Sequence, residues 1–385
     1  METGDYFESY EDIGIHKLML EDAPRNKAYR ESIHDNKELF KDKVVLDVGA
    51  GTGFLSVLCA QAGAKTVYAV EASNVYTIAE ELAAENNFSS VIKVVNGRVE
   101  DIELPEKVDI IVSEWMGFYL LHEGMLNSVI EARDRFLKPD GLLFPESATL
   151  YSAPCSIPSL YGYWQDVQGV SMNCLASKLR EQASKKPVTE IVASDDLLSD
   201  AEVVVWLDLR EVTCDDIKSI EMRHVAVANK EGRYQGICLW FTCTFPSVQT
   251  EPVTLSTEPE ELPTHWKQTV IVLPTDVPVE LGTPIAYDLS LKQSPENCRR
   301  YIIEVTMLDP EEVEHPEYCL CHMTKCILVR AMFEKYDKEY VGDAERDKEK
   351  GDDEKEDEES TEKENAMNLE EEKENCEVDN DGGED

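Results

Sequence analysis

The chain has 385 residues, of which 42% are hydrophobic, and a formal net charge of −42 at pH 7. That length and apolar content suit a globular protein of about two domains with a sizeable core. Residues 343–385 hold 22 acidic and 6 basic residues, a net −16, so the rest of the chain carries −26. Such an acidic field repels phosphate, which disfavours direct binding of nucleic acid and favours a cationic partner.

Cysteine usage and the lack of apolar segments predict an intracellular protein of the nucleus or cytoplasm. The 11 cysteines have no regular spacing, and no apolar signal segment opens the chain. No run of about 18 apolar residues occurs, so we expect no membrane partner. The cluster of Cys319, Cys321 and Cys326 encloses His322 but lacks the CxxC spacing of a zinc ligand pair, so we expect no metal site.

The first half of the chain alternates strands with helices. Its first forty residues look helical but interrupted, because Pro24 should break a helix or start a turn. The strands that we expect are Lys43–Gly53 (which ends in glycines), Thr66–Glu71, Val91–Val95 and Val108–Val112. The helices that we expect are Phe54–Ala62, Val75–Asn87 and Met125–Leu137, the last closed by a turn at 138–141. This order predicts an α/β, Rossmann-like fold with a parallel, doubly wound sheet.

After Pro145 the pattern becomes that of an antiparallel β region, a barrel or a sandwich. Its expected strands are Val203–Leu209, Ile237–Phe245, Thr269–Leu273, Pro284–Leu291 and Arg300–Leu308. Leu160–Leu179 is expected to be a helix rich in aromatic residues. Such a helix could project as an arm toward a partner, or it could pack on its own β domain.

The end of the chain, Gly342–Asp385, consists almost entirely of Glu, Asp, Lys, Asn and Gly. It cannot bury enough apolar surface to order itself, so we expect a solvated tail. The alternative is a docking segment for basic proteins.

Two carboxylates, Glu114 and Glu123, lie on the loop that follows the strand Val108–Val112. Ligands of open α/β sheets bind at the carboxyl ends of the strands. Two carboxylates on one loop can accept charge-assisted hydrogen bonds from a planar cation. We therefore expect this loop to hold a substrate arginine, although Glu123 alone could also be an acid that stabilises the start of the next helix.

The glycine turn Asp47-Val-Gly49-Ala-Gly51-Thr-Gly53 predicts a nucleoside site without a pyrophosphate cradle. It lacks the Gly-Lys-Ser/Thr of a P-loop, and the third glycine of the dinucleotide fingerprint would stand one position later. Glu71 ends the next strand and could accept two ribose hydroxyls, while Glu100 follows the third strand and suits an adenine amino group. Each acid alone could be a surface residue. Together they favour S-adenosylmethionine as the cofactor.

Several segments resemble the ordered motifs of the protein arginine N-methyltransferases, in particular their asymmetric-dimethylating (type I) group. They are VLDVGAGTG, YAVEAS, VDIIVSEWMG with Glu114 and Glu123, and THWKQ at Thr264–Gln268. The resemblance covers roughly Tyr6–Val329. It implies N-terminal helices capping the active site (1–42), a Rossmann-like S-adenosylmethionine domain (43–147), a β-barrel substrate domain (148–330) with a helical dimerisation arm at about 158–187, and an acidic tail without stable structure (331–385).

The resemblance also implies roles for individual residues, partners and an activity. The cofactor would be held by His16, Arg25 (through the methionine carboxylate), Asp47, Gly49, Gly51, Glu71, Val99 and Glu100. The substrate pocket would include Tyr6, Tyr10, Met19, Met125 and Trp266, and the catalytic residues would be Glu114, Glu123, His265 and Asp22. His265 alone could instead be a structural histidine. The implied activity is methylation of arginine in basic proteins such as histone tails by a homodimer.

Two departures from the family pattern affect the N-terminal helices. Lys17-Leu18 replaces an acidic pair, and Pro24, which precedes Arg25, could bend the helix that presents it. Cofactor affinity or substrate preference could therefore differ from the family's. One other interpretation is methylation of nucleic acid, which the acidic charge disfavours, or of a small molecule, although paired carboxylates have little use for a neutral acceptor. Another is a non-catalytic scaffold that binds S-adenosylmethionine and recruits basic proteins through its β domain and tail.

Overall fold

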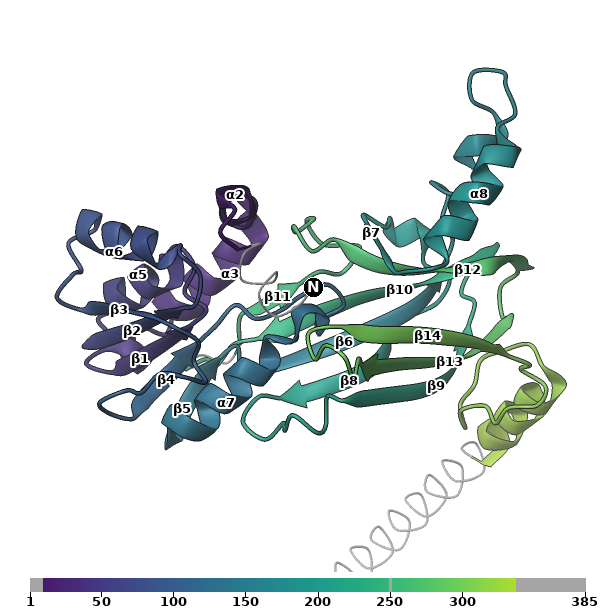
Figure 1. Cartoon of the computed structure of the whole chain (residues 1–385). Helices are drawn as coiled ribbons and strands as arrows, with labels where there is room; N and C mark the ends of the chain where they lie inside the picture. The colour runs from purple at the N-terminus through teal and green to yellow at the C-terminus, as the bar shows by residue number, and fades with distance from the viewer. Residues whose placement is uncertain (1–9, 249–250, 337–385) are drawn as a thin grey trace, which may run out of the picture. The chain divides into compact units, whose positions relative to one another are not determined.

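The computed structural model describes residues 10–248 and 251–336 (Figure 1). It divides the chain into two compact units, Met1–His315 and Pro316–Asp385. The predictions for Tyr6 and for 337–385 lie outside the described residues, whereas 331–336, which we assigned to the unstructured tail, end a helix that begins at residue 324. Among the described residues, no helix is both long and apolar enough to cross a membrane.

From residue 10 onward, where the structure describes the N-terminal segment, its helices are α2 (Ile13–Glu21), α3 (Ala23–His34) and α4 (Lys37–Phe40). Asp22 caps α3 by accepting a hydrogen bond from the backbone N–H of Arg25 at 3.0 Å. Pro24 lies in the first turn of α3, where backbone N–H groups have no partner within the helix. The N–H that proline lacks therefore costs no helical hydrogen bond. The predicted interruption is confirmed, but Pro24 opens α3 and does not bend it.

The next part of the chain forms a parallel sheet of five strands in the order β3-β2-β1-β4-β5. The strands are β1 (Val44–Val48), β2 (Thr66–Glu71), β3 (Ile92–Asn96), β4 (Val108–Val112) and β5 (Leu137–Phe144). The connecting helices are α5 (Phe54–Gln61), α6 (Tyr76–Glu85) and α7 (Leu126–Phe136). Strand order reverses between β1 and β4, which is where such sheets bind ligands. The predicted Rossmann-like core is confirmed.

The connection from α7 to β5 differs from the prediction of a turn at 138–141 followed by an extended segment. The strand begins at Leu137, directly after the helix. Leu137 pairs with Val108, and pairing then resumes at Leu142 with Ile110 after a register shift. Residues 138–141 therefore form an irregularity within the strand.

Two antiparallel sheets follow, with the strand orders β7-β12-β10-β6-β8, extended by β11 on β10, and β14-β13-β9. The five predicted strands correspond to β8 (Glu202–Asp208), β10 (Gly232–Thr244), β12 (Gln268–Val279), β13 (Pro284–Gln293) and β14 (Tyr301–Leu308). The additional strands are β6 (Ser147–Cys155), β7 (Val188–Glu190), β9 (Ser219–Val227) and β11 (Thr254–Ser256). β10 is central, because it pairs with β6, β11 and β12.

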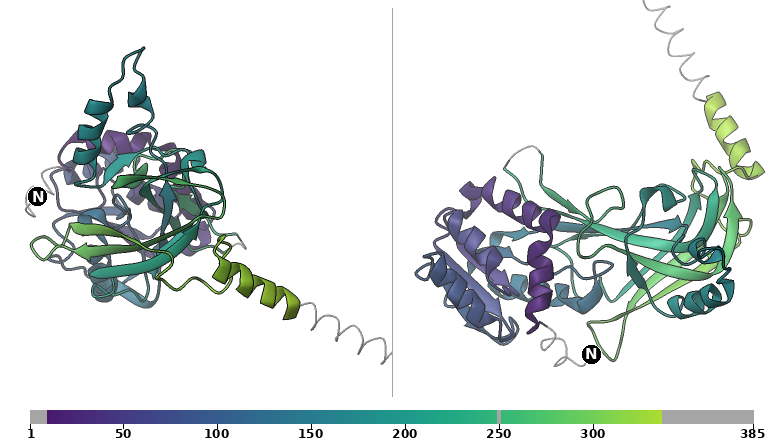
Figure 2. Two further views of the ribbon diagram at one scale, coloured as in Figure 1. Left: turned by 90° about the vertical axis from the view of Figure 1, so that its right-hand side faces the viewer. Right: turned by 90° about the horizontal axis from the view of Figure 1, so that it is seen from above.

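The predicted helix Leu160–Leu179 is wrong in its limits. The structure has a 3-10 turn at Tyr163–Gln165 and the helix α8 at Asn173–Ala183. Gln168 and Gly169 both have positive φ, 52° and 86°, in the tight turn between Val167 and Val170, so a continuous helix cannot form there. α8 and the loop before it extend away from the sheets in both Figure 1 and Figure 2. We call residues 158–187 the arm.

Candidate active site

A cavity of about 340 Å³ lies at the carboxyl ends of β1, β2 and β4. Its walls also include residues of the N-terminal helices and of the segment that precedes β12. Most of the residues that we predicted for the site line it: Tyr10, His16, Met19, Arg25, Gly49, Gly51, Glu71, Val99, Glu100, Glu114, Glu123, Met125, His265 and Trp266. Elements distant in the sequence thus meet at the switch point of the sheet.

Glu71 is held beside the glycine turn by two backbone amides. Its Oε2 accepts from the N–H of Gly51 at 2.8 Å, and its Oε1 accepts from the N–H of Ser73 at 2.7 Å. Gly49 has a φ of +72°, and a side chain there would bring its Cβ to 2.3 Å from the Cε of Met125. The turn therefore needs glycine at position 49 for its conformation, and a side chain there would also displace the end of the Met125 side chain.

Glu100 and Val99 form the far wall of the same cavity. The hydroxyl of Ser128 donates to Glu100 Oε1 at 2.7 Å, and Arg98 lies 3.4 Å from Oε2. Burial alone would raise the pKa of Glu100, but these two partners and a backbone N–H lower it below its usual value. Glu100 is therefore an ionised acceptor at neutral pH.

Asp47 does not line the cavity; it is fully buried behind the glycine turn. Its Oδ2 accepts from the hydroxyl of Ser56 at 2.6 Å, and its Oδ1 has no hydrogen-bond partner among the described residues. Burial raises its pKa to about 7. Asp47 can act on a ligand only indirectly, through the backbone of the turn.

Glu114 forms a buried ion pair with Arg25. The Nε and Nη2 atoms of Arg25 both donate to Oε2 of Glu114, at 3.2 and 3.1 Å. The pair leaves Oε1 as the second acceptor of this carboxylate. Just before it, the hydroxyl of Tyr29 donates to the carbonyl of Ser113 at 2.9 Å and so ties α3 to the loop.

Glu123 has a φ of +73°, a left-handed conformation that is uncommon for a residue with a side chain. Its Oε2 accepts from the hydroxyl of Tyr10 at 2.6 Å, and its carbonyl accepts from Nη1 of Arg299 at 2.9 Å. A Cβ on Gly117 would lie 2.1 Å from the carbonyl oxygen of His122, so the loop closes on itself only with glycine there. We call residues 113–124 the double-glutamate loop.

Asp22 and His265 form the expected pair. Asp22 Oδ2 accepts from both the ring Nδ1 and the backbone N–H of His265, at 2.6 and 2.8 Å. Burial opposes ionisation of Asp22, but His265 and the N–H of Arg25 outweigh it and lower the pKa of this carboxyl. Next to His265, the indole of Trp266 donates to the carbonyl of Met116 at 2.8 Å, which fixes this segment against the double-glutamate loop.

The lining residues that were not predicted include the polar side chains of Arg98, Ser128 and Arg299. Arg299 comes from the far end of the β region, 176 positions after Glu123. Arg299 stands directly before an expected strand that begins with Arg300, and these two adjacent basic residues in an acidic chain were the available clue. Ser128 gives no signal of its own, because a serine on one helical face is common.

Comparisons with known proteins agree with this geometry. A family model described as "Methyltransferase domain" matches residues 45–141, and one described as "Arginine methyltransferase oligomerization subdomain" matches residues 146–307. The "Protein arginine N-methyltransferase 6" of Danio rerio is 42% identical, with 80% of this chain and 90% of that protein covered. The "Probable protein arginine N-methyltransferase 6.1" of Oryza sativa subsp. indica is 41% identical, with 76% and 85% covered.

Solved structures resemble this one as well. The Trypanosoma brucei PRMT1 enzyme-prozyme heterotetrameric complex with AdoHcy has a TM-score of 0.70 and 34% identity, covering 80% of this chain and 98% of that one. A crystal structure titled PRMT6-SAH has a TM-score of 0.67 and 32% identity, covering 77% and 100%. The resemblance seen in the sequence motifs is confirmed: the chain belongs to the protein arginine N-methyltransferase family.

Proposed function

We propose that this protein transfers methyl groups from S-adenosylmethionine to the guanidinium nitrogens of arginine in basic proteins. The observation that carries the proposal is that Glu114 and Glu123 line the same cavity as the glycine turn and Glu71. One cavity therefore combines acceptors for a nucleoside with paired acceptors for a planar cation. The family membership and the net charge of −42 support the same substrate class.

The residues around the glycine turn fit an adenosine cofactor. The backbone amides of Gly51 and Ser73 hold the Glu71 carboxylate so that it can accept the ribose hydroxyls. Glu100, His16 and Arg25 line the same cavity together with Val99. Glu100 would receive the adenine amino group with Val99 as its apolar neighbour, and His16 and Arg25 would hold the methionine end. The sulfonium of S-adenosylmethionine supplies the methyl group.

The two glutamates orient the substrate and do not remove its proton in advance. Arginine has a pKa of about 13, so deprotonation at pH 7 would cost roughly 8 kcal/mol. Arg25 already uses Oε2 of Glu114, so Oε1 is the atom that receives the substrate guanidinium. Glu123 binds the second N–H edge of the substrate guanidinium. The two carboxylates then draw positive charge away from the guanidinium nitrogen that is to be methylated. Positioning that nitrogen about 3–3.5 Å from the methyl carbon supplies much of the rate acceleration.

Proton loss becomes easier after the methyl group has moved, and two groups can accept the proton. Glu123 is one, and the pair of His265 and Asp22 is the other. Asp22 accepts the hydrogen on Nδ1 of His265, so Nε2 is the ring atom that takes up a proton. The ionised Asp22 then stabilises the imidazolium.

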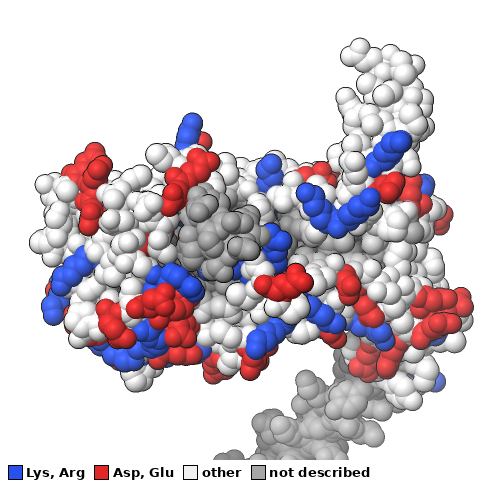
Figure 3. Space-filling view, viewed as in Figure 1, with Lys and Arg blue, Asp and Glu red and all other residues white. Residues whose placement is uncertain are grey.

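Product type and assembly extend the proposal. Met19 and Met125 line the cavity and shape it for asymmetric dimethylation, the type I product. The two antiparallel sheets close into a barrel that carries the substrate face. The arm mediates a homodimer, because Tyr163 and Val170 expose 62% and 57% of their surface there. On the face in Figure 3, the outer part of the arm carries no charged atoms, as an interface core requires.

A methylation assay tests the proposed activity. The protein is incubated with methyl-labelled S-adenosylmethionine and an Arg- and Gly-rich peptide, with the Arg-to-Lys version of that peptide as the control. We expect label on arginine only, with mono- and asymmetric dimethylarginine identified by mass spectrometry. Binding of S-adenosylmethionine by calorimetry without methylation of any arginine peptide would instead support the non-catalytic scaffold.

A further inference from the structure

Near the end of the described chain, three cysteines form the interior of a short segment. Cys319, Cys321 and Cys326 are the buried residues among the described residues 316–336. Large apolar side chains of the same segment point outward: Leu320 exposes 70% of its surface and Leu328 59%. Leucine is usually buried in a core, whereas the buried side chains among the described residues of this segment are cysteines. The segment is therefore organised around its cysteines.

The three sulfurs converge with a histidine nitrogen. The potential ligand atoms of Cys319, Cys321, Cys326 and His315 all lie within 4.8 Å of one another. All four residues belong to one continuous stretch, 315–326, so this grouping is local to the chain. A tetrahedral zinc ion with Zn–S bonds of about 2.3 Å needs ligand atoms about 3.5–3.8 Å apart. The longest of these separations would have to shorten by about 1.0–1.3 Å to complete the site.

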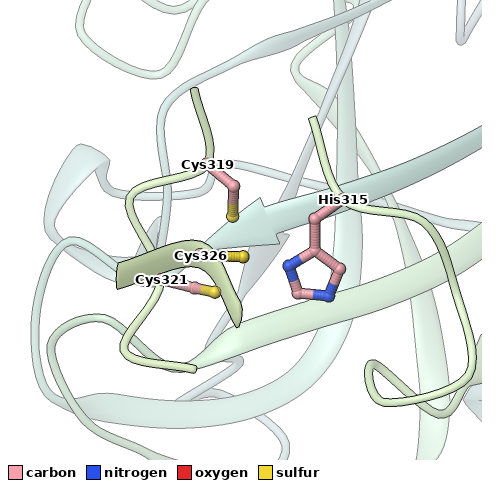
Figure 4. A group of neighbouring side chains, drawn as sticks. All are labelled: His315, Cys319, Cys321 and Cys326. Atoms are coloured by element: carbon pink, nitrogen blue, oxygen red, sulfur yellow. The ribbon is translucent and has the colours of Figure 1, made fainter. Parts of the chain in front are cut away.

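His315 is oriented as a metal-binding histidine would be. Its Nε2 lies 2.8 Å from the carbonyl of Pro310, and because a carbonyl only accepts, Nε2 carries the hydrogen. That leaves Nδ1 as the ligand atom. In Figure 4 a ring nitrogen faces the three sulfurs. A backbone carbonyl bound to the other ring nitrogen is the usual outer partner of a zinc-bound histidine.

The backbone around the cysteines is fixed as well. Arg330, on the helix 324–336, donates through Nη1 to the carbonyls of Cys319 and Cys321, at 2.6 and 3.3 Å. Its charge also balances the net −1 that three thiolates, one neutral imidazole and Zn²⁺ would carry. Cys326 lies in the first turn of that helix, where the dipole favours a thiolate.

We propose that this segment binds one structural zinc ion through His315, Cys319, Cys321 and Cys326. Three thiolates and one imidazole are a tetrahedral, closed ligand set typical of structural zinc. The ion supplies the core that the segment lacks, because a piece this short cannot be stable on apolar burial alone. The proposal replaces our sequence-based expectation of no metal. His322, the histidine inside the cysteine cluster, is exposed and takes no part.

Spacing explains why the sequence alone did not suggest the site. The ligands follow the pattern His-x3-Cys-x-Cys-x4-Cys, which lacks the CxxC pair of common zinc motifs. The segment also lies beyond residues 146–307, the part matched by the family model. The proposed site thus lies outside the matched part of the chain and is independent of the proposed methyl transfer.

Metal content of the full-length protein tests the proposal. The protein is purified under reducing conditions from cells grown without added metal. Its zinc content is measured by inductively coupled plasma mass spectrometry. We expect one zinc per chain in the wild type and at least a tenfold loss in Cys321→Ser. The matched control Cys174→Ser alters an exposed cysteine on α8 and should retain the full amount.

Two histidine variants test which ring belongs to the site. His315→Ala should lower zinc affinity at least tenfold in a competition with a colorimetric chelator, whereas His322→Ala should leave it unchanged. Replacing zinc by Co²⁺ should give the strong visible bands of a tetrahedral thiolate site in the wild type.

The proposal fails if the wild-type protein contains no zinc and takes up none from added zinc. It also fails if two of the three cysteines are joined by a disulfide in protein alkylated before lysis. Equal zinc in the wild type and in Cys321→Ser would likewise show an adventitious ion. Because the zinc content and the disulfide state are measured in the wild type as well, the proposal can be tested even if a variant does not fold.

Discussion

Tyr10 donates the hydrogen of its phenolic hydroxyl to Oε2 of Glu123 across 2.6 Å, although 113 positions separate the two residues. The carbonyl of Tyr10 accepts from Nε2 of His16 at 2.8 Å, and His16 packs against Gly51 in the cofactor turn. One residue near the N-terminus thus connects the cofactor side of the cavity with the double-glutamate loop. Ordering of this segment and formation of the catalytic arrangement are therefore coupled.

Replacing Tyr10 by phenylalanine removes the bond to Glu123 and keeps the ring. A hydrogen bond to a charged group is worth about 1.5–3 kcal/mol, so we expect kcat/KM to fall about 10- to 100-fold. Steady-state methylation of an arginine peptide measures the effect. Tyr76→Phe on α6, which lies outside the cavity lining, is the control. Equal rates for both variants would contradict the coupling.

Glu114→Gln and Glu123→Gln each replace a charged acceptor by a neutral amide of the same shape. We expect each to lower turnover by roughly 10²- to 10⁴-fold with the fold intact. Single-turnover methylation gives the rate, and circular dichroism checks the fold. Glu131→Gln on the partly exposed face of α7 should retain normal turnover. Near-normal methylation by both cavity variants would rule out the proposed role of the paired carboxylates.

Asp47 predicts a pH dependence of stability. Its pKa is raised from 3.8 to about 7 by burial, so the folded protein binds this proton more tightly than the unfolded chain. The contribution to stability is complete below pH 3.8 and is lost as the pH rises through about 7. Asp47→Asn should therefore gain stability relative to the wild type between pH 5 and pH 8, because it does not ionise.

Urea unfolding at several pH values measures this difference. Asp101→Asn, which changes a carboxylate 72% exposed to solvent, should run parallel to the wild type. A constant difference between Asp47→Asn and the wild type across this range would show that Asp47 is ionised throughout.

Charge on the arm should break the proposed dimer. Tyr163→Glu combined with Val170→Glu places two carboxylates on the exposed apolar surface of the arm. We expect a monomer with weak activity, because desolvating unpaired charges opposes association. Sedimentation velocity measures the mass. Leu262→Glu alters an equally exposed apolar residue outside the arm and should leave the dimer intact. An unchanged mass for the double variant would exclude the arm as the interface.

The parallel sheet and the cofactor turn were predictable because their signals are local. β1 and β2 consist mainly of apolar residues, Gly49 and Gly51 closely follow β1, and Glu71 ends β2. Strand order then brings these ends together. Recognition of the motifs added Arg25 and His265, which line the cavity, and Asp22, which binds His265; no local pattern could have brought these residues together.

The remaining features depend on contacts that have no local signature. The ion pair between Arg25 and Glu114 joins residues 89 positions apart, so the sequence could suggest a ligand for each but not their pairing. The limits of α8 depend on Gln168 and Gly169, which turn the chain where helical spacing continues. For the cysteine segment, proximity in sequence pointed to His322, whereas the backbone brings His315 to the sulfurs.

The left-handed backbone of the double-glutamate loop lowers stability, although the loop carries carboxylates of the cavity. Tyr119, Leu120 and Glu123 all have positive φ, at 43°, 68° and 73°. Such a conformation costs roughly 1–2 kcal/mol for a residue with a side chain, and glycine would relieve it. A search for more stable variants would therefore favour glycine at position 123, where it would remove a carboxylate of the cavity. Selection for function must hold this loop in a conformation that selection for stability alone would discard.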